Sequence, residues 1–183
     1  MNNQWVITAA HCVDGGTTAN DLILRFGEHD LKSTDEHFPH IERRVESILI
    51  HPQYSDIGLV PKHDFALLKL AKPVEYAMHV IPICLPKDNN LLVNEIAWAK
   101  GFGDLSYRGS TPTVLQEMSA PIISNYECEK WTWSRIRNIP KIMMCVGNKQ
   151  EKNNICQGDS GGPLVVKHDG FQIYEIHFSF LNI

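Results

Sequence analysis

The stretch Gly-Asp-Ser-Gly-Gly-Pro-Leu at residues 158–164 is the most informative part of this 183-residue sequence. Glycine permits backbone conformations and close approaches that other residues resist. A glycine-rich loop of this kind can therefore expose the hydroxyl of Ser160 and aim successive backbone N–H groups at one point outside the chain. Acyl transfer needs both features, because it requires a nucleophile and donors for the oxygen that becomes negative in the transition state.

Two upstream stretches supply the partners that such a serine requires. Thr-Ala-Ala-His-Cys at residues 8–12 carries His11, and His-Asp-Phe-Ala-Leu-Leu at residues 63–68 carries Asp64. A serine hydroxyl needs a base within hydrogen-bond reach, and histidine titrates near neutral pH. A carboxylate on the far ring nitrogen then fixes the tautomer of the imidazole. Each residue alone is more often structural than catalytic, but the three together predict a catalytic triad.

The spacing Gly158-x-Ser160-x-Gly162 also fits the nucleophile elbow of the α/β-hydrolases. In that fold the order along the chain is serine, then acid, then histidine. Only 23 residues follow Ser160 in this sequence, too few for the remaining strands and helices of such a fold. The order His11, Asp64, Ser160 therefore argues against the elbow interpretation.

In this order the three stretches resemble those of the trypsin-like (chymotrypsin-fold) serine endopeptidases, and the resemblance covers nearly the whole chain. It implies an all-β fold of two six-stranded antiparallel Greek-key barrels, the first over about residues 1–90 and the second over about residues 91–183. His11 and Asp64 would come from the first barrel, and Ser160 from the second. The implied reaction is hydrolysis of peptide bonds through a Ser-His-Asp triad and an acyl-enzyme intermediate.

The resemblance assigns further roles around the serine. The backbone N–H groups of Gly158 and Ser160 would form the oxyanion hole. Asp159 would be the carboxylate that receives a newly released terminal ammonium group when a zymogen is activated. Asn154, six residues before the nucleophile, and Ser179 would line the primary substrate pocket. Because Asn154 has no charge to pair with a cationic side chain, we expect a specificity other than for Arg or Lys.

Hydrophobic periodicity independently predicts a chain of many short strands with turn signals between them. Strands are expected at residues 5–8, 22–26, 41–50, 65–70, 98–103, 114–118, 142–145, 164–166 and 171–180, with a short, proline-interrupted run at 80–85. The one convincing helix signal is Ser-Asn-Tyr-Glu at residues 124–127, which is the capping-box pattern of a serine with a glutamate three residues later. An all-β sandwich or barrel fits this pattern.

Composition argues against several classes of partner. The formal net charge of -4 gives no electrostatic reason to expect nucleic acid or an anionic membrane as a partner. No run of 18 apolar residues is present, so no transmembrane helix is expected. The spacing His37-x-x-His40 has no cysteine or carboxylate cluster at ligand spacing beside it, and we expect neither a metal nor a cofactor.

The five cysteines have two possible interpretations on composition alone. They are either buried thiols of a cytosolic protein or part of a disulfide framework, whose odd number leaves at least one thiol without a partner in this chain. The family resemblance implies a secreted, extracellular protein with a disulfide between Cys128 and Cys145. It further implies that Cys12 and Cys156 have their partners outside this chain, and that Cys84 bridges to a light chain or pro-region.

Measured against the family, the sequence begins only ten residues before His11 and ends early after Ser160. The resemblance therefore predicts a peptidase domain that is truncated at both ends. The parent protein is expected to act on protein or peptide substrates and to be a target of serpin-type or other protein inhibitors. The alternative is a catalytically incompetent, truncated homologue that acts as a binding module, or a partial gene model.

Overall fold

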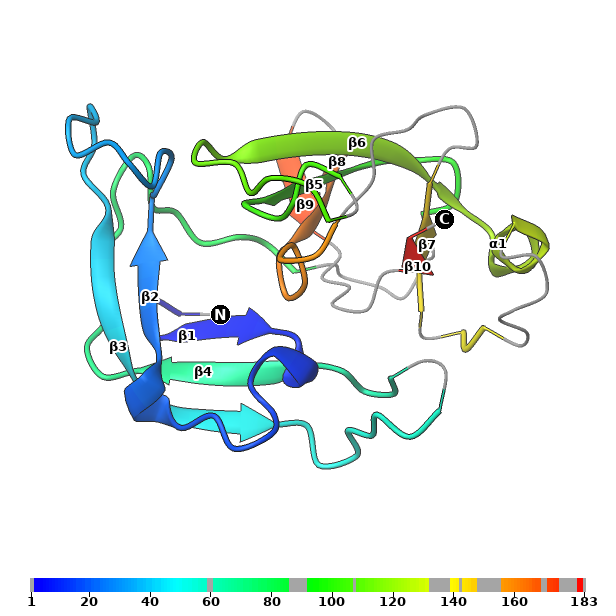
Figure 1. Cartoon of the computed structure of the whole chain (residues 1–183), viewed down its shortest axis with the longest axis horizontal. Helices are drawn as coiled ribbons and strands as arrows, with labels where there is room; N and C mark the ends of the chain where they lie inside the picture. Colours follow the sequence, from blue (N-terminus) through cyan, green and yellow to red (C-terminus); the bar gives the residue numbers. More distant parts are fainter. Residues whose placement is uncertain are drawn as a thin grey trace. The chain divides into compact units, whose positions relative to one another are not determined.

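The computed structural model describes residues 2–58, 61–85, 92–106, 108–131, 139–141, 143–147, 156–168, 171–174 and 181–182. These residues fall into two compact units, Met1–Ile83 with Thr113–Leu115 and Cys84–Pro112 with Gln116–Ile183 (Figure 1). Most of the regular structure is β-strand, and the described part of the chain has a single α-helix. The predicted all-β class is confirmed.

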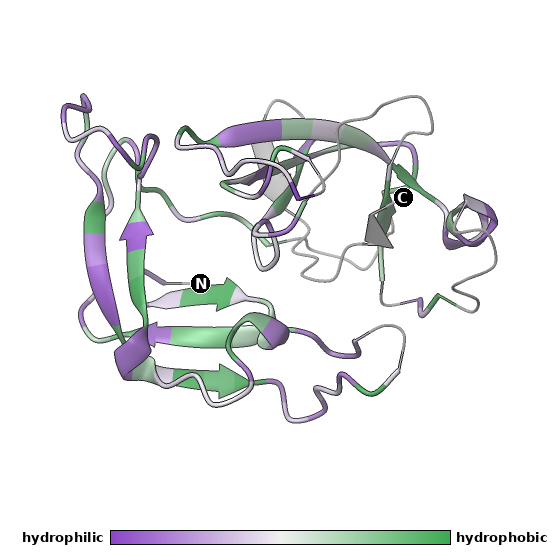
Figure 2. Ribbon diagram, viewed as in Figure 1, coloured by the Kyte–Doolittle hydropathy of each residue, from purple (hydrophilic) through white to green (hydrophobic). Residues whose placement is uncertain are grey.

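The first unit contains a four-stranded antiparallel sheet. Its strands are β1 (Trp5–Thr8), β2 (Ile23–Phe26), β3 (Ile41–Ile50) and β4 (Ala66–Leu70), in the order β1-β4-β3-β2 (Figure 1). Side chains alternate across a strand, so every second residue of β4 can face the same core. Ala66, Leu68 and Leu70 are accordingly buried, while the two residues between them are half-buried. Figure 2 shows how hydrophobic residues dominate β1 and β4.

Two further features complete the first unit. A 3-10 turn at Ala19–Asp21 is capped by the residue before it, because the Thr18 N–H and hydroxyl both donate to Asp21 Oδ2, at 2.8 and 2.6 Å. The segment Thr113–Leu115 pairs with the loop after β2. There the Leu31 N–H donates to the Thr113 carbonyl and the Leu115 N–H donates to the His29 carbonyl, each at 2.8 Å.

The second unit contains a six-stranded sheet in the order β10-β7-β6-β5-β8-β9. Its strands are β5 (Ile96–Gly101), β6 (Gln116–Ile123), β7 (Cys145–Val146), β8 (Leu164–His168), β9 (Phe171–Tyr174) and β10 (Leu181–Asn182). All neighbours pair antiparallel except β7 and β10, which pair parallel over two residues. The long connection between β7 and β10 permits this, since parallel strands need a crossover of a dozen or more residues. The buried core of this sheet comprises Ala97, Ala99, Ala120, Ile122, Met144, Val146, Leu164 and Val166.

The strand boundaries depart from the predicted ones mainly in the second unit. β6 begins at Gln116 rather than at Val114, because Val114 forms a β-bridge with Asp30 in the first unit. It then continues through Pro121, whose carbonyl accepts the Gly147 N–H at 3.1 Å. Residues 80–85 form no strand: Val80 forms an isolated bridge with Ala77, and Cys84 is a further isolated bridge residue. The predicted stretch at 175–180 lies outside the described residues.

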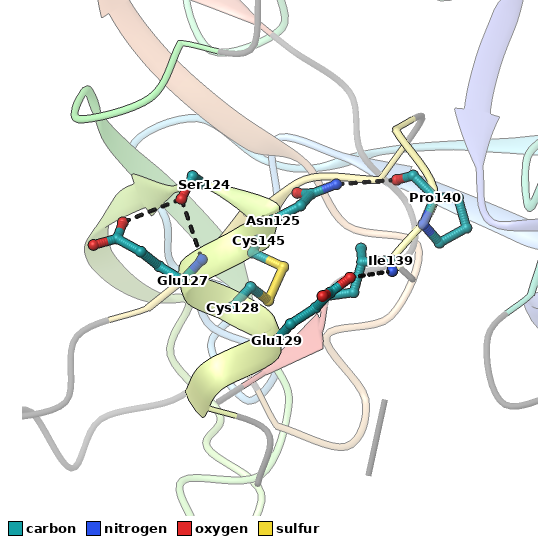
Figure 3. Close-up of a disulfide and its surroundings, with 8 residues drawn as sticks. All are labelled: Ser124, Asn125, Glu127, Cys128, Glu129, Ile139, Pro140 and Cys145. Atoms are coloured by element: carbon teal, nitrogen blue, oxygen red, sulfur yellow. Dashed lines mark hydrogen bonds between the residues drawn. A yellow bond between two sulfur atoms is a disulfide. The ribbon is translucent and has the colours of Figure 1, made fainter. Parts of the chain in front are cut away.

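The helix α1 (Asn125–Trp131) begins where the capping-box pattern predicted. Ser124 Oγ accepts the Glu127 N–H at 3.2 Å and donates to Glu127 Oε2 at 3.3 Å (Figure 3). The disulfide between Cys128 and Cys145 ties α1 to β7, as the family resemblance implied. Closing a loop of this length stabilises a fold by about 3 kcal/mol in the chain-entropy model. No helix among the described residues is long and apolar enough to cross a membrane.

Candidate active site

His11 lies on a short 3-10 turn, Ala10–Cys12, that follows β1 directly. The two residues before it, Ala9 and Ala10, are completely buried, so only small side chains fit at this point. The turn thereby anchors the backbone while the His11 side chain stays partly exposed, at 37%. The buried alanines explain why a small-residue pair precedes the histidine.

Asp64 contacts His11 through both of its carboxylate oxygens. Its Oδ1 accepts the His11 backbone N–H at 2.9 Å, and its Oδ2 lies 2.7 Å from His11 Nδ1. The Asp64 side chain is only 1% exposed, and this is the one buried charged residue in the described part of the chain. A buried carboxylate is tolerated only when it is hydrogen-bonded. The contact favours the tautomer with a proton on Nδ1, which leaves Nε2 as the basic nitrogen.

The Asp64 carboxylate also affects two neighbouring acids. Partial burial of the sulfur raises the pKa of Cys12, and the negative charge of Asp64 raises it further. The Cys12 Sγ lies 3.6 Å from His11 Nε2, the nitrogen on the side of the ring away from Asp64. Burial and the nearby carboxylates, with Asp64 foremost, raise the pKa of the Tyr54 hydroxyl. In both groups burial is the larger cause of the raised pKa, and the charge of Asp64 adds to it.

The loop that carries Ser160 is a tight turn held by its own backbone. The Asp159 N–H donates to the Cys156 carbonyl at 3.1 Å, and the Gly162 N–H donates to the Asp159 carbonyl at 3.0 Å. Gly158 has φ +97°, a backbone conformation that glycine adopts readily and that residues with a side chain rarely adopt. Ser160 lies at the tip of this turn and is exposed. The local sequence therefore places Ser160 on an exposed turn of the second unit.

Asp159 lies in a recess made by two glycines that the sequence analysis did not identify as site residues. Its Oδ1 accepts the Gly103 N–H at 2.8 Å and its Oδ2 accepts the Cys156 N–H at 2.9 Å. A side chain at Gly101 or Gly103 would overlap the carboxylate. The spacing Gly-Phe-Gly at residues 101–103, just after a strand, is the signal from which this recess could have been suspected.

A cavity of about 190 Å³ adjoins this recess. Asp159 lines it together with backbone and side chains of β5 and β6, including the ion pair of Lys100 Nζ with Glu117 Oε2 at 2.8 Å. Both partners of that pair are exposed by more than a third, and such pairs contribute little to stability. The cavity is therefore a solvent-accessible space with a well-anchored carboxylate at its wall.

The structure brings the predicted residues into two groups. His11 and Asp64 are in contact within the first unit, while Gly158, Asp159 and Ser160 share one turn in the second unit. The predicted pocket residues Asn154 and Ser179 lie outside the described residues.

The remaining cysteines and histidines form neither a second disulfide nor a metal-binding group in the described part of the chain. Cys12, Cys84 and Cys156 take part in no disulfide there, and Cys12 and Cys84 are exposed. Among the described residues no group of three histidine, cysteine or acidic side chains is arranged to hold a metal ion.

Comparison with known proteins gives a family match over almost the full length. The family model described as Trypsin matches residues 1–177. Serine proteinase stubble of Drosophila melanogaster is 43% identical over 91% of this chain and 21% of its own length. Venom serine protease Bi-VSP of Bombus ignitus is 36% identical over 96% of this chain and 49% of its own length. Ovochymase-2 of Mus musculus is 36% identical over 92% of this chain and 27% of its own length. The chain thus spans half or less of the length of these relatives.

Proposed function

The chain belongs to the trypsin family of serine peptidases, and from this premise we propose that it is an endopeptidase whose triad is Ser160, His11 and Asp64. The observation that carries the proposal is the double contact of His11 with a buried aspartate, with Nδ1 to Oδ2 at 2.7 Å. A histidine held in this way has its basic Nε2 directed away from the carboxylate. The exposed serine in a glycine-rich turn supports the assignment of the nucleophile.

Each step of the proposed reaction uses a named atom of this chain. Ser160 Oγ attacks the carbonyl carbon of the scissile peptide bond while His11 Nε2 takes the hydroxyl proton. The backbone N–H groups of Gly158 and Ser160 donate to the oxygen that becomes negative. His11 then returns the proton to the leaving amine, and an acyl-enzyme remains. Water, deprotonated by His11, then attacks the acyl carbon. The bond from that carbon to Ser160 Oγ breaks, the acid leaves, and His11 returns the proton to Ser160 Oγ.

Asp159 is proposed to control whether this oxyanion hole is formed. Two backbone N–H groups already hold its carboxylate, and the adjoining cavity of about 190 Å³ leaves room for a further donor. A terminal ammonium group is the donor that zymogen activation would supply. Because Asp159 directly precedes Ser160, such a contact would order the backbone that forms the oxyanion hole.

The substrate, partners and location are part of the same proposal. Protein or peptide substrates are expected, with a primary specificity other than for Arg or Lys because Asn154 is uncharged. The exposed thiol of Cys84 is a suitable anchor for a disulfide-linked light chain or pro-region, and serpin-type inhibitors would recognise the same serine. The Cys128–Cys145 disulfide supports an extracellular location, since such bonds persist in oxidising compartments.

Labelling with a fluorophosphonate probe tests the proposal directly, because the probe reacts only with an activated serine. The purified 183-residue chain is compared with Ser160→Ala and His11→Ala variants, and the labelled peptide is identified by mass spectrometry. Labelling at Ser160 that both substitutions abolish is the expected result. A folded wild-type chain that resists labelling would refute an assembled active site and favour the binding-module alternative. Cleavage of a peptide library then tests the specificity, and preferred cleavage after Arg or Lys would contradict it.

A further inference from the structure

The loop between β3 and β4 places Asp64 at its far end, two residues before β4 begins at Ala66. The loop is closed at its base by the His51 N–H, which donates to the Phe65 carbonyl at 3.1 Å. A second rung joins Ser55 and Lys62, whose backbones exchange hydrogen bonds of 3.1 and 2.8 Å. The position of Asp64 therefore depends on the few residues between this second rung and the start of β4.

His63, the residue before Asp64, has an unusual backbone conformation. Its φ is +50°, and the described residues other than glycine contain only two further positive φ values, at Asn94 and Arg108. The Phe65 N–H donates to the His63 carbonyl at 2.8 Å, so a three-residue turn has Asp64 at its centre. The chain bends at His63, and the carboxylate at the centre of this turn is the one that contacts His11.

Two aromatic contacts hold this turn in place. The His51 ring stacks on the His63 ring with centroids 4.8 Å apart and planes 14° apart. The same His51 ring packs against Phe65 with centroids 4.6 Å apart. His51 is itself oriented, because its Nδ1 accepts the Gln53 N–H at 3.2 Å. His51 therefore braces the residues on both sides of Asp64.

We propose that His63 is a positioning residue for the triad: its left-handed backbone, braced by the His51 ring, directs the Asp64 carboxylate at His11. Backbone strain of this kind persists only where surrounding structure enforces it, and it is concentrated at functional sites. If the chain led into β4 with an ordinary extended conformation at residue 63, the Asp64 side chain would point in another direction. The inference rests on the proposed function, since it assigns His63 a part in orienting His11.

Paired substitutions separate the backbone from the ring. His63→Asn removes the ring but keeps a residue type that adopts positive φ comparatively easily, whereas His63→Val removes both. His51→Ala removes the brace, and His51→Phe keeps an aromatic ring there. Asn94→Val is the matched control, because it also places a β-branched residue at a positive φ, but in the second unit.

Two readouts report on the site. The far-downfield proton resonance of the His11 Nδ1–H bonded to Asp64 reports the contact itself, without need of catalysis. For the active chain, kcat and KM on a peptide substrate report its consequence. His63→Val should lose the resonance and lower kcat by up to about 100-fold with little change in KM, as misplacement of a catalytic group by about 1 Å does. His63→Asn and His51→Phe should retain most of both signals, and His51→Ala should lose part of each.

The proposal is overturned if a folded His63→Val chain keeps the resonance and kcat of the wild type, or if Asn94→Val loses them equally. Should His63→Val not fold, His51→Ala gives the same decision, and an unchanged resonance and kcat there overturn the proposal. The proposed function fails separately. A wild-type chain that shows the resonance and its dependence on His63, but takes up no fluorophosphonate, would refute the peptidase assignment and support the positioning role.

Discussion

Replacement of Gly103 by alanine is the sharpest test of how the Asp159 carboxylate is held. Gly103 is buried, and a Cβ built on it would lie 2.6 Å from Asp159 Oδ1 and overlap the rest of the carboxyl group. Real Cβ atoms do not approach other atoms this closely, so the carboxylate would have to move. Moving it breaks the hydrogen bonds from the N–H groups of Gly103 and Cys156.

The expected loss of stability follows from these two bonds. A hydrogen bond to a charged group contributes about 1.5–3 kcal/mol, which sets an upper limit of about 6 kcal/mol for both. Because Asp159 is only half-buried, the displaced carboxylate regains part of this from water, and we expect a loss of about 3 kcal/mol. An alanine at an unstrained position should otherwise stabilise a fold by up to about 1 kcal/mol, through the unfolded chain.

A double-mutant cycle with Asp159→Ala isolates the effect. Urea denaturation of the wild type, both single variants and the double variant gives four free energies of unfolding. In the Asp159→Ala background there is no carboxylate to displace, so Gly103→Ala should change stability by about 1 kcal/mol or less. The coupling energy, which is the difference between the effects in the two backgrounds, should then be about 2–4 kcal/mol. An equal loss from Gly103→Ala in both backgrounds would refute the reasoning, because the penalty would then come from other neighbours.

Three further predictions concern acids and the disulfide. The Asp64 charge contributes to the raised pKa of Cys12, so Asp64→Asn should speed iodoacetamide alkylation of that thiol at pH 8. The rate is measured relative to alkylation of exposed Cys84 in the same sample, and an unchanged ratio of the two rates would contradict the prediction. Hydrogen bonds from Thr18 lower the pKa of Asp21 in the folded chain. The stability difference between wild type and Asp21→Asn should therefore be complete above about pH 5 and should vanish as the pH falls through the lowered folded pKa. Chemical denaturation at a series of pH values measures this difference, and a difference that persists in acid would contradict the prediction. Replacing Cys128 and Cys145 together by alanine should cost about 3 kcal/mol in reversible denaturation, and no loss would show that the unfolded chain gains little from the cross-link.

The parts of the fold that sequence predicts well are those set by local pattern. β3 has the predicted bounds of Ile41–Ile50, since its run of β-prone residues and its closing His-Pro are both local signals. The start of α1 follows from the side chain of Ser124, which satisfies a backbone N–H three residues on. The triad motifs are likewise short, and two of the residues they predict, His11 and Asp64, are in contact.

The parts that sequence missed depend on contacts with distant residues. The positive φ of His63, whose ring stacks on that of His51 at the start of the same loop, could not be predicted, because no residue type in the Lys-His-Asp stretch before β4 requires it. The need for glycine at position 103 comes from Asp159, 56 residues later in the chain. Val114 reads as part of a strand with Gln116, yet it pairs with Asp30 because tertiary pairing overrides the local pattern.

The segment Thr113–Leu115, which pairs with the loop after β2, sets the order in which the hydrogen bonds of the first unit form during synthesis. As the polypeptide leaves the ribosome, β1 to β4 are all present once Leu70 has emerged. At that point the backbone groups of His29 and Leu31 still lack their hydrogen-bonding partners, Leu115 and Thr113. In a nascent chain halted before Thr113, the first sheet would be present while these backbone groups in the loop after β2 were still solvated by water. The first unit therefore reaches its final hydrogen bonding only after translation of the second has begun. A folding assay on stalled chains of increasing length should show that step once Leu115 has left the ribosome.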